Sequence, residues 1–289
     1  MFRAKPARDG ADRETTLIHN QWKIAGASLL ALGFATACGG ETPPPVEPAP
    51  PPVAETPAPP PGPDYASFVS SPGRIADDTA KDAARKPAEV LAFSKIMPGQ
   101  TVFEMEAGAG YYTELLSLTV GPTGKVIMQA PKEFEGFYKD ALAARTKANR
   151  LANVTVSWSP FDKLDAADAS VDVVTWFQGP HELYCAKACG NAAMGDPAKS
   201  FAEVARILKP GGLLVIMDHV APSGAPTTSG NDLHRIDPLP VKALATGAGF
   251  ALEEESTLLA NPADDHTKGV FDPSIQGKTD QFLVRYKKP

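Results

Sequence analysis

The feature of this chain that most constrains its fold is an alternation of short apolar runs with longer amphipathic segments between residues 101 and 288. The apolar runs have the length and composition of strands, and the amphipathic segments repeat apolar residues at helical spacing. Such alternation predicts a mostly parallel β-sheet with helices on both faces. We expect strands at 101–105, 124–130, 153–158, 171–177, 212–219 and 279–288, and helices at 111–120, 131–149, 196–210 and 239–249.

Two further segments support an α/β fold. The run VDVVTWF at 171–177 is apolar almost throughout, which is typical of a strand buried on both faces of a parallel sheet. Residues 75–97 are rich in Ala and amphipathic, which predicts a helical segment that is interrupted or restarted at Pro87.

A proline-rich segment precedes this region. Of the 29 prolines, 12 lie between Pro43 and Pro63. A segment with so little to bury cannot offset the entropy lost on ordering, so we expect an extended spacer. We therefore predict a linker at 39–63 and one α/β domain at 64–289, whose length of about 225 residues suffices for a sizeable core.

The N-terminal segment is interpreted as an export signal. The apolar run IAGASLLALGFATACGG at 24–40 follows Lys23, and it is shorter than the roughly 20 residues that span a bilayer. Its end, Ala-Thr-Ala-Cys38, resembles a bacterial lipobox. We expect a signal peptide at 1–38, with an acylated Cys38 as mature start and the protein lipid-anchored to a bacterial membrane, facing the periplasm. An ordinary secretion signal and a short buried helix are the alternatives.

The charge of the chain limits its partners. The net charge is −6 and the pI is near 5.4, which argues against nucleic acid as the main partner. Residues 1–37 contain five Lys or Arg and three Asp or Glu, so their removal changes the net charge from −6 to −8. We therefore expect membrane attachment through the lipid anchor only.

Two cysteines, Cys185 and Cys189, lie four residues apart. In an exported chain such a pair predicts a disulfide, although this spacing requires a loop or turn rather than a helix. Two free thiols, or a metal site shared with His181, are the alternatives; three ligands in one short loop are weak evidence, and we expect no metal.

In a parallel sheet, ligands bind beyond the carboxyl ends of the strands. This rule brings four segments to one opening: residues 106–112, 129–134, 177–184 and 218–224. The first of them is a Gly-rich turn between a strand and a helix, and it is the candidate ligand loop.

Several of these segments together resemble the class I S-adenosylmethionine (SAM) dependent methyltransferases. VFEMEAGAGYYTE at 102–114 is similar to their first motif, and FAEVARILKPGGLLVIMDH at 201–219 is similar to their late helix–turn–strand segment. LHRIDPLPV at 233–241 and the stretch 261–289 are similar to a narrower bacterial group of predicted methyltransferases. The resemblance covers about residues 75–289. It implies a Rossmann-like, seven-stranded, mostly parallel sheet with an antiparallel last strand, SAM as cofactor and methyl transfer to a small-molecule acceptor.

The resemblance also implies roles for residues of the Gly-rich loop. Glu104 matches the acid that ends the first strand and holds the methionine end of SAM. Gly108 and Gly110 match the second and third glycines, of which one lets the backbone approach the ligand and the other lets helix and strand pack closely. Glu106 takes the place of the first glycine, where a side chain costs about 1–2 kcal/mol if φ is positive.

Two more positions depart from the family pattern. Gln129 stands where the family usually has an acid on the ribose hydroxyls, and we expect its amide to contact the ribose. Asp162 lies near the adenine-side acid of the family but out of register with it.

The methyl acceptor needs a group that removes its proton. The predicted fourth strand delivers His181 to the opening, and an unperturbed pKa near 6.5 suits a base at neutral pH. Glu182 is a candidate to orient His181, and His219 is the reserve candidate for the base. A different reading remains open at this stage, in which an exported protein keeps the fold as a binding or scaffold module without the chemistry.

Overall fold

The structure is a computed structural model that describes residues 62–147, 150–185 and 194–289. The expected signal peptide with Cys38, nearly all of the expected linker, and Cys189 lie outside the described residues. Within the described part, no helix combines the length and the apolar composition that crossing a membrane requires.

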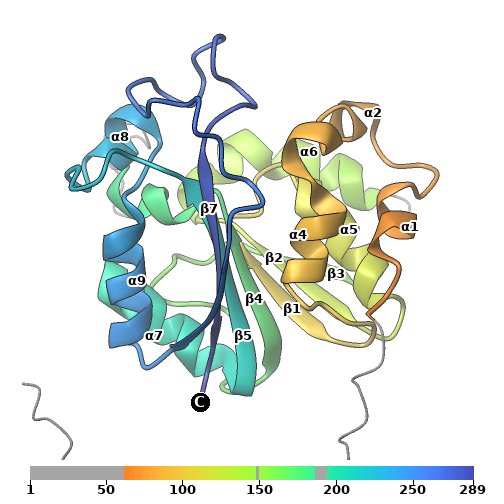
Figure 1. Cartoon of the computed structure of the whole chain (residues 1–289). Coiled ribbons are helices and arrows are strands. Elements are labelled where there is room, and N and C mark those ends of the chain that lie inside the picture. Colours follow the sequence, from red (N-terminus) through yellow and green to blue (C-terminus); the bar gives the residue numbers. More distant parts are fainter. Residues whose placement is uncertain (1–61, 148–149, 186–193) are drawn as a thin grey trace, which may run out of the picture. The chain divides into compact units, whose positions relative to one another are not determined.

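The described residues form a seven-stranded sheet with the strand order β3-β2-β1-β4-β5-β7-β6 (Figure 1). Neighbouring strands from β3 to β5 run parallel, and β7 is antiparallel to both of its neighbours. The predicted Rossmann-like α/β fold is therefore confirmed. The strands are β1 Thr101–Met105, β2 Lys125–Gln129, β3 Val154–Ser157, β4 Val171–Phe177, β5 Leu208–His219, β6 Ala251–Ser256 and β7 Gln281–Lys287.

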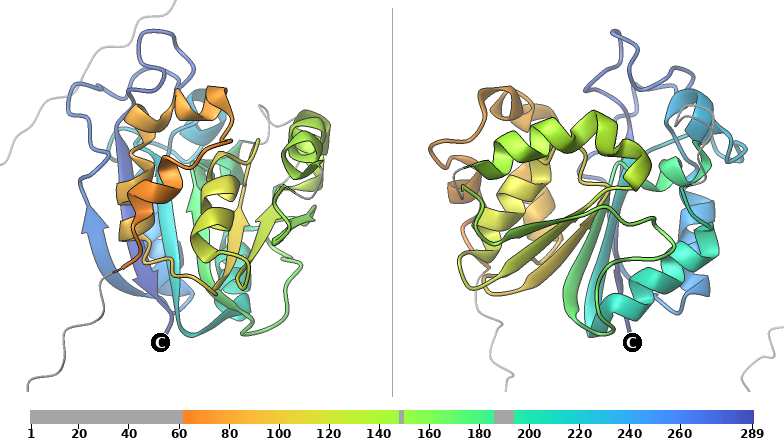
Figure 2. Two further views of the ribbon diagram at one scale, coloured as in Figure 1. Left: turned by 90° about the vertical axis from the view of Figure 1, so that its right-hand side faces the viewer. Right: turned by 180° about the vertical axis from the view of Figure 1, so that it is seen from behind.

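Helices cover both faces of the sheet, as Figures 1 and 2 show. One face packs against α4 and α5, and the other packs against α7 and α9. Alternate residues of β1 supply the two cores: Val102 belongs to the first and Phe103 to the second. The helices are α1 Tyr65–Val69, α2 Ala76–Thr79, α3 Asp82–Arg85, α4 Pro87–Phe93, α5 Tyr111–Val120, α6 Glu135–Thr146, α7 Pro197–Ile207, α8 Ser229–Leu233 and α9 Pro238–Gly247, with 3-10 turns η1 Lys132–Phe134 and η3 Pro180–Tyr184.

The strand order places the site. β1 lies between β2 and β4, so the connections that leave β1 and β4 at their carboxyl ends diverge to opposite faces of the sheet. The crevice between such connections is the place where ligands bind in open α/β sheets. All of β4 except Asp172 is buried, as its continuous apolar sequence predicts.

The structure differs from the prediction at the N-terminal helical segment and at β6. Residues 75–97 form three short helices: the predicted interruption at Pro87 is confirmed, since Lys86 takes a left-handed conformation (φ +45°) and ends α3, and a second, unpredicted break separates α2 from α3. The strand β6 was not predicted, since its sequence ALEEES is rich in Glu and poor in β-branched residues. It forms because it is an edge strand, whose exposed faces accept charged residues.

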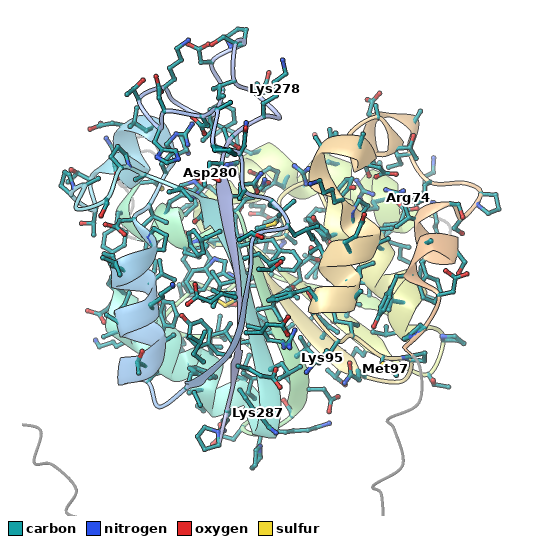
Figure 3. The ribbon with its side chains drawn as sticks, in the orientation of Figure 1. Arg74, Lys95, Met97, Lys278, Asp280 and Lys287 are labelled. Carbon is teal, nitrogen blue, oxygen red and sulfur yellow. The ribbon has the colours of Figure 1, made fainter. Side chains whose placement is uncertain are left out.

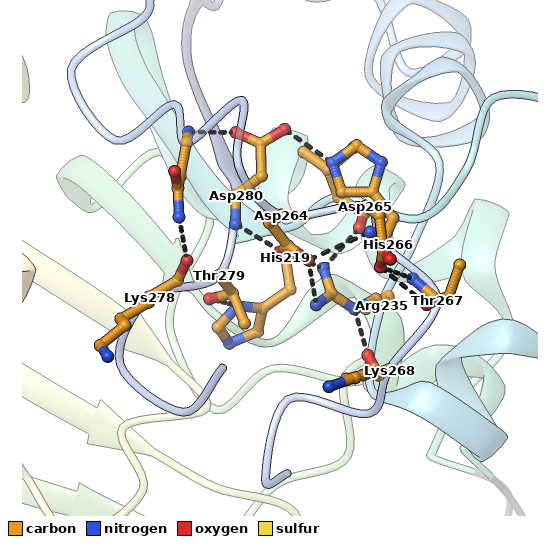
Figure 4. Close-up of polar contacts among 12 residues, drawn as sticks. His219, Arg235, Asp264, Asp265, His266, Thr267, Lys268, Lys278, Thr279 and Asp280 are labelled. Atoms are coloured by element: carbon orange, nitrogen blue, oxygen red, sulfur yellow. Dashed lines mark hydrogen bonds and ion pairs between the residues drawn. The ribbon is translucent and has the colours of Figure 1, made fainter. Parts of the chain in front are cut away.

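The C-terminal segment between β6 and β7 is fixed by a buried ion pair. Arg235 is fully buried, and its guanidinium binds the Asp264 carboxylate at 2.9 Å and donates to the carbonyl oxygens of Val220 and Lys268. Figure 4 shows this network together with Asp280, whose N–H donates to the same carboxylate at 2.7 Å. Two of the motifs that suggested the narrower bacterial group, at 233–241 and 261–289, therefore hold each other in place.

The strand β7 runs the full height of the sheet. Asp280, just before its first residue, and Lys287, at its last, lie at opposite ends (Figure 3). The Asp280 end is the end at which the C-terminal segment meets the carboxyl ends of the parallel strands.

Candidate functional site

A cavity of about 260 Å³ lies at the carboxyl ends of β1 and β4. It is lined by three groups of residues: the Gly-rich loop after β1, a cluster of histidines and acids after β4 and β5, and side chains of α3, α6 and the C-terminal segment. The lining includes Arg85, Glu104, Glu106, Gly108, Tyr138, His181, Glu182, His219, His234 and Phe271.

Glu104 is the last polar residue of β1 and is buried at 4% exposure. The Thr113 hydroxyl, in the first turn of α5, donates to its carboxylate at 2.5 Å. Burial raises the pKa of Glu104 to about 8, although the hydrogen bond from Thr113 and the charge of Arg145 act in the opposite direction. A buried acid that lines a cavity is suited to a cationic ligand, because such a ligand would stabilise the ionised carboxylate.

Glu106 follows β1 in a left-handed conformation, with φ +50°. Its N–H donates to the side-chain oxygen of Gln129 at 3.0 Å. One carboxylate oxygen, Oε2, is buried and has no hydrogen-bond partner among the described residues. Burial, followed by the nearby charge of Glu182, raises the pKa of Glu106 to about 8. The turn therefore has the positive φ that favours glycine, and the Glu106 side chain at this position destabilises the turn by about 1–2 kcal/mol, as expected for a Cβ at positive φ.

The two glycines of the loop serve different purposes. Gly108 has φ +55°, and a Cβ added there would meet no atom within 4 Å, so its backbone borders open space in the cavity. Gly110 has φ +83° and precedes α5; a Cβ there would lie 2.8 Å from the Arg145 side chain. Gly110 thus permits close packing of α6 against the loop.

Gln129 and Asp162 are not among the residues that line the cavity. Gln129 is fully buried, and besides accepting from the Glu106 N–H, its amide donates to the Ser159 carbonyl oxygen at 2.6 Å. Asp162 accepts from the Asp196 N–H at 3.0 Å, on the loop before α7. This geometry speaks against the expected ribose contact, because the amide of Gln129 is already used to hold the loop.

His181 is buried at 3% exposure in the turn after β4. Its ring Nδ1 and its backbone N–H both donate to the carboxylate of Asp218, each at 2.8 Å. Burial alone would lower the pKa of His181, but the charge and hydrogen bond of Asp218, together with Glu182, outweigh it and raise the pKa to about 10. This environment favours the protonated imidazole, in contrast to the unperturbed pKa near 6.5 from which the sequence analysis argued.

The ring Nε2 of His181 faces two further side chains. It lies 3.3 Å from a carboxylate oxygen of Glu182 and 3.3 Å from Nδ1 of His234. His234 ends α8 in a left-handed conformation, with φ +51°, and its ring packs edge-on against Phe271. The sequence analysis assigned no role to His234 or Asp218, although LHRID and MDH were among the segments quoted for the resemblance.

His219 also lines the cavity, but its environment differs from that of His181. Its Nδ1 lies 2.8 Å from the Thr279 hydroxyl. Burial lowers its pKa to about 3, so the ring is neutral at physiological pH. Neighbouring histidines of which one is protonated and the other neutral are typical of sites where one group acts as an acid and the other as a base.

Cys185 is buried and disulfide-bonded. The other two cysteines of the chain, Cys38 and Cys189, lie outside the described residues. The pairing of Cys185 with Cys189 remains a prediction.

Residues 107–216 match the family described as "Methyltransferase domain". Arsenite methyltransferase of Halobacterium salinarum is 26% identical over 204 residues, which are 67% of this chain and 46% of that protein. A ubiquinone/menaquinone biosynthesis C-methyltransferase of Saccharophagus degradans is 25% identical over 185 residues, 63% of this chain and 69% of the relative. The chain thus spans about half the length of the first of these relatives.

Among solved structures, a SAM-dependent methyltransferase from Aquifex aeolicus has the same fold. It aligns with a TM-score of 0.54 and 23% sequence identity, over 78% of this chain and 99% of that one. A parallel sheet with a Gly-rich loop after β1 and a cavity at the strand ends defines a class of nucleotide-cofactor enzymes. The match of residues 107–216 to the methyltransferase domain and the sheet order together support the expected class I SAM-dependent methyltransferase superfamily, with S-adenosylmethionine as its cofactor. These findings support the expected superfamily, enzyme class and cofactor for the matched region.

The cavity fits the methionine end of SAM. That end carries an ammonium and a sulfonium, and two carboxylates, Glu104 and Glu106, line the cavity beside the loop. The open space beside Gly108 allows the backbone to approach a ligand. The unpartnered Oε2 of Glu106 is an acceptor that a cationic ligand would satisfy.

Proposed function

We propose that this protein transfers the methyl group of SAM to a small-molecule acceptor that enters the cavity beside His181. The observation that carries the proposal is the single cavity that joins the Gly-rich loop to the cluster of His181, Glu182 and His234. A cofactor held by the loop and an acceptor held by the cluster would face each other across this space. When bound, SAM supplies a methyl group on a positively charged sulfur.

The residues of the loop have separate tasks in this proposal. Glu104, fixed by Thr113, pairs with the ammonium of SAM, and the backbone at Gly108 lies along the ligand. Tyr138 from α6 and Phe271 from the C-terminal segment add aromatic surface to the lining of the cavity.

The acceptor side depends mainly on positioning. Methyl transfer is an in-line displacement, so holding the acceptor in line supplies much of the rate. Because the pKa of His181 is raised, its resting state is suited to donate a hydrogen bond to an acceptor anion. The role of His181 as a general base, which the sequence suggests, requires that this proton first leave.

The test of the proposal is calorimetry of the purified protein with SAM and with S-adenosylhomocysteine, followed by turnover with candidate acceptors. We expect both cofactor forms to bind. His181→Ala should lower turnover about 10²-fold, the usual size of a proton-transfer or positioning effect at one side chain, with SAM affinity nearly unchanged. Absence of binding by either cofactor form would refute the proposal.

We further propose that the protein is exported and lipid-anchored through Cys38, facing the periplasm. The disulfide at Cys185 supports this location, since disulfides persist mainly in oxidising compartments. The test is incorporation of labelled palmitate in a bacterial host: we expect label in the wild type and none in Cys38→Ser. An unlabelled wild type would refute the anchor.

A further inference from the structure

Three potential ligand atoms converge on one point of the cavity. Nε2 of His181, a carboxylate oxygen of Glu182 and Nδ1 of His234 all lie within 4.8 Å of one another. The three separations are 3.3 Å, 3.3 Å and 3.7 Å. A point equidistant from the corners of such a triangle lies about 2.0 Å from each atom, which matches the roughly 2.0–2.2 Å of bonds from zinc to His nitrogen and carboxylate oxygen. The spacing of the three atoms is therefore that of ligands around one ion.

A second set of contacts orients the central ligand. Nδ1 of His181 donates to Asp218, which is fully buried and also accepts from the His181 backbone N–H. This fixes the hydrogen on Nδ1 and directs Nε2 toward the other two ligands. A carboxylate behind a ligating histidine is the usual outer partner in metal sites, where it sets the tautomer and the ring orientation.

Close packing brings the third ligand to the first. A Cβ at Gly230 of α8 would lie 2.4 Å from the His181 carbonyl oxygen, so α8 rests directly on the turn that carries His181. At the end of α8, His234 adopts the left-handed conformation (φ +51°) that commonly ends a helix, and its Nδ1 lies 3.3 Å from Nε2 of His181.

The cluster is open on the cavity side. Side-chain exposure is 4% for His181, 13% for Glu182 and 23% for His234, and all three line the cavity. Glu106 also lines the cavity. Its carboxylate oxygen Oε2 has no hydrogen-bond partner among the described residues. A group bound at the open positions of an ion would find this carboxylate oxygen as a hydrogen-bond acceptor.

We propose that His181, Glu182 and His234 bind a divalent transition-metal ion through Nε2, carboxylate and Nδ1. Two imidazoles and one carboxylate suit Zn²⁺, Fe²⁺ or Mn²⁺ rather than Ca²⁺ or Mg²⁺, which prefer oxygen ligands. Three protein ligands leave positions open toward the cavity, as in catalytic rather than structural sites. This differs from the sequence-based expectation of no metal. With the ion bound, Nε2 of His181 is a ligand, so the ion takes the place of the Nε2 hydrogen that would otherwise face the acceptor.

The site also suggests the class of methyl acceptor, a part of the inference that rests on the proposed function. A small molecule with an ionisable hydroxyl, in particular one with a second oxygen close by, would fill the open positions. The charge of the ion would lower the pKa of that hydroxyl.

The test uses tag-free protein, treated with a chelator and titrated with Co²⁺. We expect one equivalent to bind with visible absorption bands, and Zn²⁺ to displace it. Glu182→Gln and His234→Ala should weaken binding about 10-fold or more, because even loss of an outer partner has effects of 10–100-fold. His266→Gln is the matched control: His266 pairs with Asp280 at 2.9 Å outside the cluster, and its variant should bind like the wild type.

SAM calorimetry on the same samples separates the two proposals. Variants that lose Co²⁺ but keep SAM binding are folded and support the metal site. Wild-type protein that binds SAM but takes up no stoichiometric Co²⁺, or cluster variants that bind Co²⁺ as tightly as the wild type, would overturn the metal site and leave the proposed methyl transfer standing. Wild-type protein that binds Co²⁺ but neither SAM nor S-adenosylhomocysteine would refute the proposed methyl transfer and leave the metal site standing.

Discussion

Replacing Glu106 by glycine should make the protein more stable. Glu106 holds φ +50° immediately after β1, and its buried Oε2 has no hydrogen-bond partner within the described part of the chain. Both features are unfavourable in the ligand-free fold, and Glu106→Gly removes both.

The size of the effect follows from these two terms. Relief of the left-handed conformation contributes about 1–2 kcal/mol, and the greater freedom of glycine in the unfolded chain takes back about 0.5–1 kcal/mol. Removing a buried acceptor without a partner adds about 1–3 kcal/mol. The net stabilisation is therefore about 3 kcal/mol, which for a domain of this size raises Tm by roughly 6–12 °C.

Two variants separate the contributions. Ala169 has φ +47° and is exposed, so Ala169→Gly changes the backbone term alone and should raise Tm by at most about 6 °C. Glu106→Gln keeps the backbone conformation and replaces the ionisable carboxyl by a neutral amide, so its Tm should lie between those of the wild type and Glu106→Gly.

The assay is thermal unfolding of the four proteins in the same buffer without SAM, followed by calorimetry with SAM. Glu106→Gly should bind SAM within a few-fold of the wild type or better. If Glu106→Gly has a Tm no higher than that of the wild type, then neither the left-handed backbone nor the buried carboxylate of Glu106 destabilises the ligand-free fold. A rise equal to that of Ala169→Gly would show that the carboxylate contributes nothing.

Three other predictions concern the cofactor loop and the C-terminal segment. Gly108→Val should abolish SAM binding, measured by calorimetry, whereas Gly110→Ala should mainly lower Tm, because its Cβ would meet a neighbouring side chain at 2.8 Å. Burial raises the pKa of Glu104 to about 8, so its contribution to the stability of the ligand-free fold is complete below about pH 4.5 and is lost as the pH rises through the folded pKa. Pairing with the ammonium of SAM should then release roughly 0.9 protons from this carboxyl at pH 7; calorimetry in buffers of different ionisation enthalpy measures this, and a Glu104→Gln variant that releases as many protons as the wild type would contradict the assignment. Arg235→Ala should destabilise the protein by about 3–5 kcal/mol in denaturant unfolding, since it leaves Asp264 buried without its partner. A loss below about 1 kcal/mol, as for an exposed ion pair, would contradict the conclusion that this pair fixes the C-terminal segment.

Local pattern predicted the elements whose burial is uniform. Helix α5 begins and ends where the sequence suggests, at Tyr111 and Val120, because the Gly-rich turn precedes it and Gly121 stops it. Strand β4 was evident since both of its faces are covered. Strand β6 was not, because an edge strand with both faces exposed carries no apolar period.

The loop could be located from its motif, but its contacts could not. Glu104, Gly108 and Gly110 line or shape the cavity as the resemblance implies. The amide of Gln129 is satisfied by Glu106 and Ser159, and this depends on how two loops meet in the folded protein. The histidine cluster joins residues 37 and 53 positions apart in the chain. Contacts between residues so far apart in the chain cannot be predicted from the spacing of residues within a short motif.

The position of β7 has a consequence for how the protein is made. Although β7 is the last strand described, it lies between β5 and β6 and pairs with both. During synthesis β6 therefore emerges before β7, the strand with which it pairs. The segment with Asp264 likewise cannot take its final position until β7 has been made. The cofactor loop, which depends on β1, β2 and β4, has its neighbours much earlier. The acceptor side is thus completed last, and a chain interrupted before residue 281 would present an unpaired strand and an open site to chaperones and proteases rather than a partly active enzyme.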